Sequence, residues 1–109
     1  VQVDLAGEAS KSGAAPGGLA PLLERVAATA GLELRGLMII PPLGPDAEAA
    51  RPWFRRLRSL SRELAAAGLL PGEPDLSMGM SGDYEVAVEE GATHLRLGTT
   101  LFGARPPRS

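Results

Sequence analysis

Two turns rich in small residues follow successive apolar runs in the last third of the chain. The first is SMGMSG at residues 77–82, and the second is GTT at residues 98–100. Hydroxyl groups and backbone N–H groups that converge at such turns bind anions without requiring much positive charge. The predicted phosphate donors are Ser77, Ser81, Gly98 and Thr99. The alternative is that both segments are ordinary strand-to-helix turns with helix caps.

Arg96 stands two positions before the second turn, in the sequence HLRLGT. On an extended strand its side chain would share a face with His94 and Gly98, so it should point toward the mouth of the site. A buried arginine must be paired or hydrogen-bonded, which implies a ligand or a carboxylate nearby. A structural ion pair would meet the same need, and the residues alone leave both explanations open.

The apolar pattern predicts four strands that alternate with three helices. The strands are expected at residues 1–5, 32–40, 75–79 and 93–97, the helices at about residues 19–30, 52–67 and 83–90, and a last element from residue 101. This alternation, with continuously apolar strands, is typical of a parallel sheet covered by helices. Function in such folds lies at the carboxyl ends of the strands, so both turns should meet there. Ser81 should also cap the helix that starts near Asp83.

Four parallel strands are a poor place for this kind of fold to stop. A complete (β/α)8 barrel takes roughly 250 residues, so the length and the strand count fit about half of one. Half a barrel leaves two exposed sheet edges, which would favour association. We therefore expect a missing half, in the same gene product or as a separate segment. In such barrels the last two strands are the usual position for a phosphate.

Composition excludes several classes of function. The net charge of −2 gives no positive field for nucleic acid or an anionic membrane surface. The chain has no cysteine, which excludes a disulfide framework and favours the cytoplasm, and no apolar run approaches the ~20 residues of a membrane span. His94 is the single histidine and is expected to pack on a strand rather than bind metal. Glu89-Glu90 and Arg55-Arg56 are expected on solvated helix faces.

These residues carry a resemblance to a known family. LSMGMSGDYEVAVEEGATHLRLGTTLFGAR, at residues 76–105, resembles the C-terminal signature of the pyridoxal 5′-phosphate (PLP) homeostasis protein family. VQVDLAGEASKSG and LRGLMII resemble the two preceding strands and their loops. The resemblance implies a single-domain α/β fold, a PLP-binding (β/α)8 TIM barrel of the alanine racemase N-terminal-domain type. Residues 1–109 would be its C-terminal half, strands five to eight.

The resemblance also implies a PLP site at the barrel mouth. The cofactor-binding residues would be Ser77, Met80, Ser81, Arg96, Gly98 and Thr99. The phosphate would lie between the turn after the third strand and the turn after the fourth. Arg96 would face the pyridine nitrogen. Because arginine stays protonated, it would keep that nitrogen unprotonated and suppress the electron-sink chemistry of the ring. No catalytic residue and no metal ligand is expected.

The family's Schiff-base lysine lies on an early strand, in the N-terminal half that this chain lacks. Lys11 is the single lysine present. A flexible loop of serine and glycine neither desolvates nor orients an amine well, so we do not expect Lys11 to form the imine.

The resemblance implies a non-enzymatic role in intracellular PLP homeostasis, in which the protein sequesters the cofactor and delivers it to apo-PLP enzymes. The alternative is a PLP-dependent enzyme resembling an amino-acid racemase. Such an enzyme needs a second acid/base residue across the cofactor, and Tyr84 is the single tyrosine here. A third possibility is a half-barrel that acts on another phosphorylated metabolite, which would require that no lysine of the complete protein forms an imine.

Overall fold

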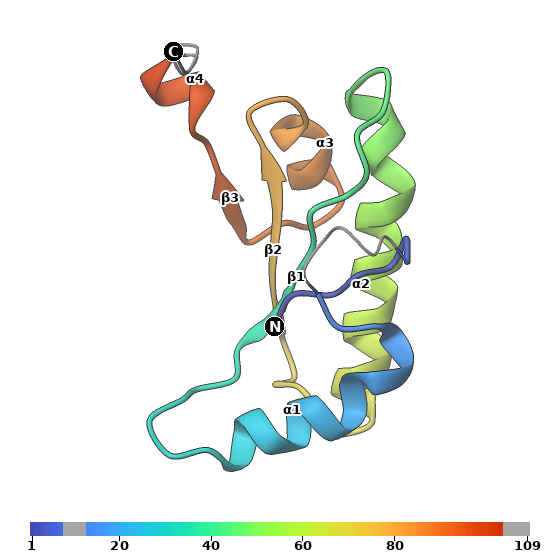
Figure 1. Ribbon diagram of the computed structural model, residues 1–109, viewed down its shortest axis with the longest axis vertical. Helices are drawn as coiled ribbons and strands as arrows, with labels where there is room; N and C mark the ends of the chain where they lie inside the picture. Colours follow the sequence, from blue (N-terminus) through green and yellow to red (C-terminus); the bar gives the residue numbers. More distant parts are fainter. Residues whose placement is uncertain (8–12, 104–109) are drawn as a thin grey trace.

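The computed structural model describes residues 1–7 and 13–103. Helices and strands alternate along them, with α1 at the end of the molecule opposite α4 (Figure 1). The elements are η1 (Pro16–Gly18), α1 (Leu19–Ala28), β1 (Gly36–Met38), η2 (Ala47–Ala50), α2 (Arg51–Ala66), β2 (Asp75–Met80), α3 (Tyr84–Glu89), β3 (His94–Arg96) and α4 (Thr99–Phe102), where η marks a 3₁₀ helix. The predicted helices and the last three predicted strands are therefore all present, with shorter bounds for most of them.

The strands form one parallel sheet in the order β1-β2-β3. Gly36 pairs with Asp75 at one end of the register, and Ser77 pairs with His94. Neighbours in sequence are neighbours in the sheet, and right-handed crossovers then place α2 and α3 on the same face. The prediction of a parallel α/β fold with helices outside the sheet is confirmed.

The first predicted strand, at residues 1–5, is reduced to isolated bridges. Gln2 pairs in parallel with Met38, and the N–H of Val3 donates to the Met38 carbonyl over 2.9 Å. Beyond that point the pairing changes partner, because the N–H of Asp4 donates to the Ala14 carbonyl over 2.9 Å. The segment therefore lies beside β1 in the predicted parallel direction, but its hydrogen bonds are divided between two neighbours and form no regular strand.

The core lies between the sheet and the helices. Leu19 and Leu23 of α1 and Phe54 and Leu57 of α2 are fully buried, as their helical spacing predicted. The sheet and α3 contribute Leu37, Leu76, Met78, Val86 and Ala87. Burying each large apolar side chain stabilises the fold by about 1.5–3 kcal/mol, so this layer holds the strand ends in place.

The end of β2 requires a glycine at position 79. Its φ is +104°, a backbone conformation that residues with a side chain rarely adopt, and a Cβ there would lie 2.6 Å from the Cβ of Ala87. The missing side chain lets α3 pack directly over the end of β2. The start of α3, and the turn that leads into it, are positioned by this contact.

Within the described ranges, residues 1–7 and 13–103, no helix is long and apolar enough to cross a membrane.

Candidate functional site

A cavity of about 880 Å³ lies at the carboxyl ends of β2 and β3. Three segments form its walls: the loop after β1 together with η2, the turn after β2, and the turn after β3 with the start of α4. Of the predicted site residues, Met80, Ser81, Arg96, Gly98 and Thr99 line it. The structure therefore brings both small-residue turns to one cavity, as expected from the parallel sheet.

A hydrogen bond joins the two turns directly. The N–H of Thr100 donates to the Ser81 hydroxyl oxygen over 2.9 Å, although the two residues are 19 positions apart in sequence. The expected cap of α3 by Ser81 is wrong, because Asp83 holds the N-cap position and makes no side-chain capping bond. A hydroxyl that accepts one bond can still donate its own proton, so Ser81 retains a donor for a ligand.

Asp83 organises the first turn and was missed by the sequence analysis. Its carboxylate accepts the N–H of Met80 over 2.8 Å, and its own N–H donates to the Met80 carbonyl over 3.1 Å. The Met80 amide is therefore engaged within the turn, and Met80 meets the cavity through its exposed side chain. The signal was available: aspartate side chains near turns commonly bond backbone groups a few positions away in the chain.

Ser77 lies deeper in the sheet than the other predicted site residues. It pairs with Met38 on one side and with His94 on the other, and its carbonyl accepts the Ile39 N–H over 3.1 Å. The described residues that line the cavity do not include it. The structure thus gathers five of the six predicted residues and leaves Ser77 behind them on β2.

Arg96 reaches from β3 into the cavity wall. Its Nη2 donates to the Ile39 carbonyl over 2.8 Å, so the partner in this structure is a backbone carbonyl rather than the expected carboxylate or ligand. Burial lowers the pKa of Arg96, and the nearby Asp83 carboxylate opposes that effect. Arginine still remains charged at neutral pH.

The Nε of Arg96 is the unusual feature of the site. It is buried and has no hydrogen-bond partner among the residues that the structure describes. A buried donor without a partner is rare in folded proteins and costs free energy. An acceptor atom of a bound ligand would remove that cost.

The second turn offers backbone donors at the start of α4. The Gly98 carbonyl accepts from Leu101 and Phe102, which closes the first turn of this short helix. Among residues 1–7 and 13–103, no backbone carbonyl accepts the N–H groups of Gly98 and Thr99. With the Thr99 hydroxyl, they can meet an anion in the cavity.

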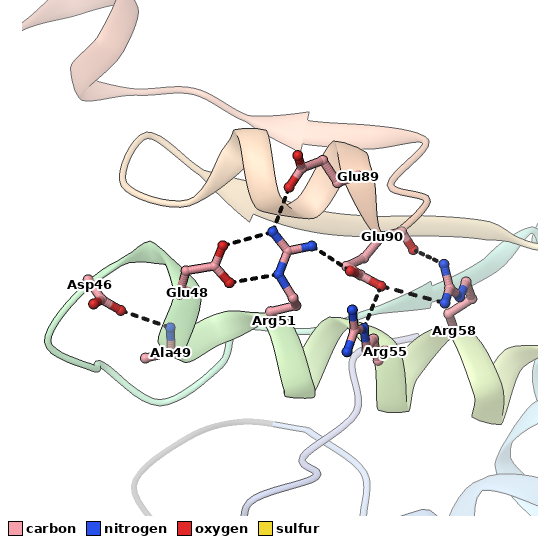
Figure 2. Close-up of polar contacts among 8 residues, drawn as sticks. All are labelled: Asp46, Glu48, Ala49, Arg51, Arg55, Arg58, Glu89 and Glu90. Carbon is pink, nitrogen blue, oxygen red and sulfur yellow. Dashed lines mark hydrogen bonds and ion pairs between the residues drawn. The ribbon is translucent and has the colours of Figure 1, made fainter.

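An ion cluster lies between α2 and α3 (Figure 2), among side chains that are not part of the described cavity lining. Its acceptor at the centre is Glu90, whose carboxylate contacts Arg51 at 2.6 Å, Arg55 at 3.1 Å and Arg58 at 3.5 Å. The expectation that Glu90 lies on a solvated helix face is wrong, because its side chain is only 6% exposed. The six-residue α3 ends against α2, and that packing buries the carboxylate at the end of the helix.

The two sides of this cluster stabilise each other's charged forms. The Arg51 hydrogen bond is the main cause that lowers the pKa of Glu90 below its ordinary value of 4.5. In turn, hydrogen bonds to Glu48, Glu89 and Glu90 raise the pKa of Arg51. Arg51 and Glu90 therefore both stay ionised across the neutral range.

The other residues singled out in the sequence lie outside the cavity. His94 is exposed, and its Nδ1 lies 3.0 Å from the Thr93 hydroxyl, so the expected packing role is wrong. No group of three or more metal-ligating side chains occurs in the part of the chain that the structure describes. Lys11 lies outside the described residues.

Comparisons with known proteins agree with this geometry. The family described as "Alanine racemase, N-terminal domain" matches residues 1–106. The chain is 50% identical to the pyridoxal phosphate homeostasis protein of Pseudomonas aeruginosa over 105 residues, which cover 96% of this chain and 44% of that protein. The protein of the same name from Aquifex aeolicus is 46% identical over 105 residues, covering 96% and 46%. The resemblance noted in the sequence is thus confirmed.

Solved structures give the same result. PipY of Synechococcus elongatus, solved with PLP bound, superposes with a TM-score of 0.79 at 38% identity, covering 94% of this chain and 47% of PipY. The PLP-free structure of PipY gives a TM-score of 0.80. The chain spans about half the length of the curated relatives it matches. By its sequence match and its α/β fold, the chain belongs to the family of the alanine racemase N-terminal domain.

Proposed function

We propose that the chain binds PLP in the cavity at the carboxyl ends of β2 and β3. The observation that carries this proposal is the Arg96 guanidinium, held by the Ile39 carbonyl with its buried Nε unpartnered. The volume of about 880 Å³ is within the range of small-molecule sites and holds a cofactor of this size. The names of the relatives and the PLP bound to PipY support the same ligand.

The donors of the cavity match the two ends of PLP. The hydroxyls of Ser81 and Thr99 and the N–H groups of Gly98 and Thr99 form the phosphate side. Arg96 supplies a permanently charged donor for the pyridine nitrogen, which favours an unprotonated ring. When bound, PLP supplies a reactive aldehyde. This chain's own residues hold its phosphate and its ring nitrogen.

The role we propose is sequestration and delivery of the cofactor for PLP homeostasis, without catalytic turnover. A racemase-like activity would need an acid/base residue beside the ligand. Tyr84 is the first residue of α3 and is absent from the described residues that line the cavity. An unprotonated ring nitrogen would also disfavour carbanion chemistry, so the carrier role is the better supported of the two.

We further propose that the chain is the C-terminal half of a (β/α)8 barrel. β3 is an edge of the described sheet. Leu43 and Phe102, which line the cavity, are exposed, and so is Leu101 next to Phe102. An N-terminal half would cover this surface and would bring the Schiff-base lysine. Apo-PLP enzymes as recipients and a cytoplasmic location remain predictions.

Reductive labelling of the complete protein tests this proposal. The protein is incubated with PLP, reduced with borohydride and mapped by mass spectrometry. We expect the label on a lysine in the half that this chain lacks, and a large loss of PLP affinity in Arg96→Ala. A label on Lys11, or no label at all, would contradict the assignment of the site.

A further inference from the structure

Arg51 contacts three carboxylates that belong to two separate elements. Its Nε and Nη2 contact Glu48 of η2 at 2.7 and 2.9 Å. Nη2 also contacts Glu89 of α3 at 2.6 Å, and Nη1 contacts Glu90, the next residue, at 2.6 Å. Figure 2 shows the guanidinium between η2 and α2 on one side and α3 on the other. Its side chain is 20% exposed, so water screens these contacts less than contacts at the open surface.

The two elements that Arg51 joins carry two walls of the cavity. η2 contributes Ala47 and Ala50, and Asp46, which caps η2 by accepting the Ala49 N–H over 3.1 Å, lies in the same wall. The turn that leads into α3 contributes Ser81 and Asp83. Arg51 itself is not among the described residues that line the cavity.

The fork geometry of arginine suits this task. A guanidinium presents five donors in one rigid plane, so it can fix several carboxylates at once, whereas the lysine ammonium is a point charge on a flexible stem. α3 is only six residues long, and holding its last residues also determines where its first turn lies. The bridge therefore sets the separation of η2 from the Ser81 turn.

We propose that Arg51 is a positioning residue for the phosphate side of the cavity. By joining Glu48 to Glu89 and Glu90, it holds the Ser81 turn at the distance from η2 and from the second turn that a phosphate requires. This inference rests on the proposed function, because it takes PLP as the ligand. It assigns the phosphate selectivity of the site to a residue outside the described lining of the cavity.

Affinities of the complete protein for PLP and for pyridoxal, which lacks the phosphate, test this role. In Arg51→Met we expect the preference for PLP over pyridoxal to fall about tenfold, while the affinity for pyridoxal changes little. Arg51→Lys should retain part of the preference, because one charge remains without the fork. Arg62→Met is the matched control: it removes an exposed arginine of α2 and should leave the preference within about twofold of the unsubstituted protein.

The measured preferences distinguish a failure of the Arg51 proposal from a failure of the proposed phosphate site. A loss of PLP preference in Arg51→Met but not in Arg62→Met supports the positioning role. Unchanged preference in a folded Arg51→Met, or an equal loss for both ligands, overturns it. If the unsubstituted protein does not prefer PLP over pyridoxal, the proposed phosphate site itself is wrong. If Arg51→Met does not fold, the same criteria apply to Arg51→Lys.

Discussion

The two ends of α3 lie beside charged groups that differ in how fully they are hydrogen-bonded. At its start, the Ser81–Asp83 turn faces a cavity in which the Arg96 Nε has no partner among the described residues. At its end, the carboxylate of Glu90 is surrounded by three arginines. A cluster whose polar groups are all hydrogen-bonded fixes the elements that carry them. A site with an unpartnered buried donor is stabilised when a ligand supplies the missing acceptor. The contrast separates the cavity, which can bind a ligand, from the ion cluster around Glu90, which positions the elements that form the cavity.

The largest expected effect is on the cavity side, from Arg96→Ala. Removing a charged donor to a buried acceptor costs about 1.5–3 kcal/mol, so PLP affinity should fall roughly 10- to 150-fold. Arg96→Lys should recover little, because an ammonium cannot replace the planar fork. Titration of the complete protein, followed by the absorbance of the cofactor, measures both variants. Affinity equal to that of the unsubstituted protein would remove Arg96 from the site.

The phosphate donors should have a smaller effect. Ser81→Ala combined with Thr99→Val removes two hydroxyls, each contributing about 1 kcal/mol, so PLP affinity should fall roughly tenfold or more. Ser81→Ala also removes the acceptor of the Thr100 N–H. Ser59→Ala, an exposed serine on α2 outside the cavity, is the control. If the double variant retains full affinity for PLP, the phosphate lies elsewhere.

In the ion cluster, Glu90→Gln should lower the thermal stability of the protein and leave its affinity for pyridoxal unchanged. Three arginines would lose their shared carboxylate, and we expect the Tm to fall by about 5 °C. Because the pKa of Glu90 is lowered in the folded state, its contribution is present above pH 4.5 and is lost as the pH falls through its lowered pKa. Thermal unfolding at several pH values should show Glu90→Gln converging with the unsubstituted protein in acid. Parallel pH curves would contradict this origin of the effect.

The smallest effect is expected from Glu48→Gln, at the exposed rim of the same cluster. The Glu48 side chain is 65% exposed, and exposed ion pairs contribute little to stability. The Tm should change by less than about 2 °C. A loss as large as that of Glu90→Gln would mean that burial does not set the strength of these pairs.

Local patterns in the sequence were sufficient for most elements and for most of the site. The helical spacing of Leu19, Leu23, Phe54 and Leu57 predicted the buried faces of α1 and α2. The small-residue turns and Arg96 could be assigned to one edge, because parallel strands place their carboxyl ends together. The prediction failed for Asp83, whose partner is three residues away, and for Glu90, whose partners are distant in the chain.

Asp83 and Glu90 show two different kinds of failure. Asp83 bonds within its own turn, so its role was readable from a spacing of three residues and was overlooked. Glu90 lies 39 residues from Arg51, and no local pattern distinguishes it from the exposed Glu89 beside it. The exposed position of His94 likewise depends on what covers β3.

The order of elements, the apolar faces and the chemistry of the turns follow from residue types and short spacings, since each depends on neighbours within one turn or strand. The junction of Ser81 with Thr100, the carbonyl partner of Arg96 and the burial of Glu90 arose only when the chain folded on itself. These contacts join residues 19 to 57 positions apart, and their distances are set by how the helices pack on the sheet rather than by any local preference.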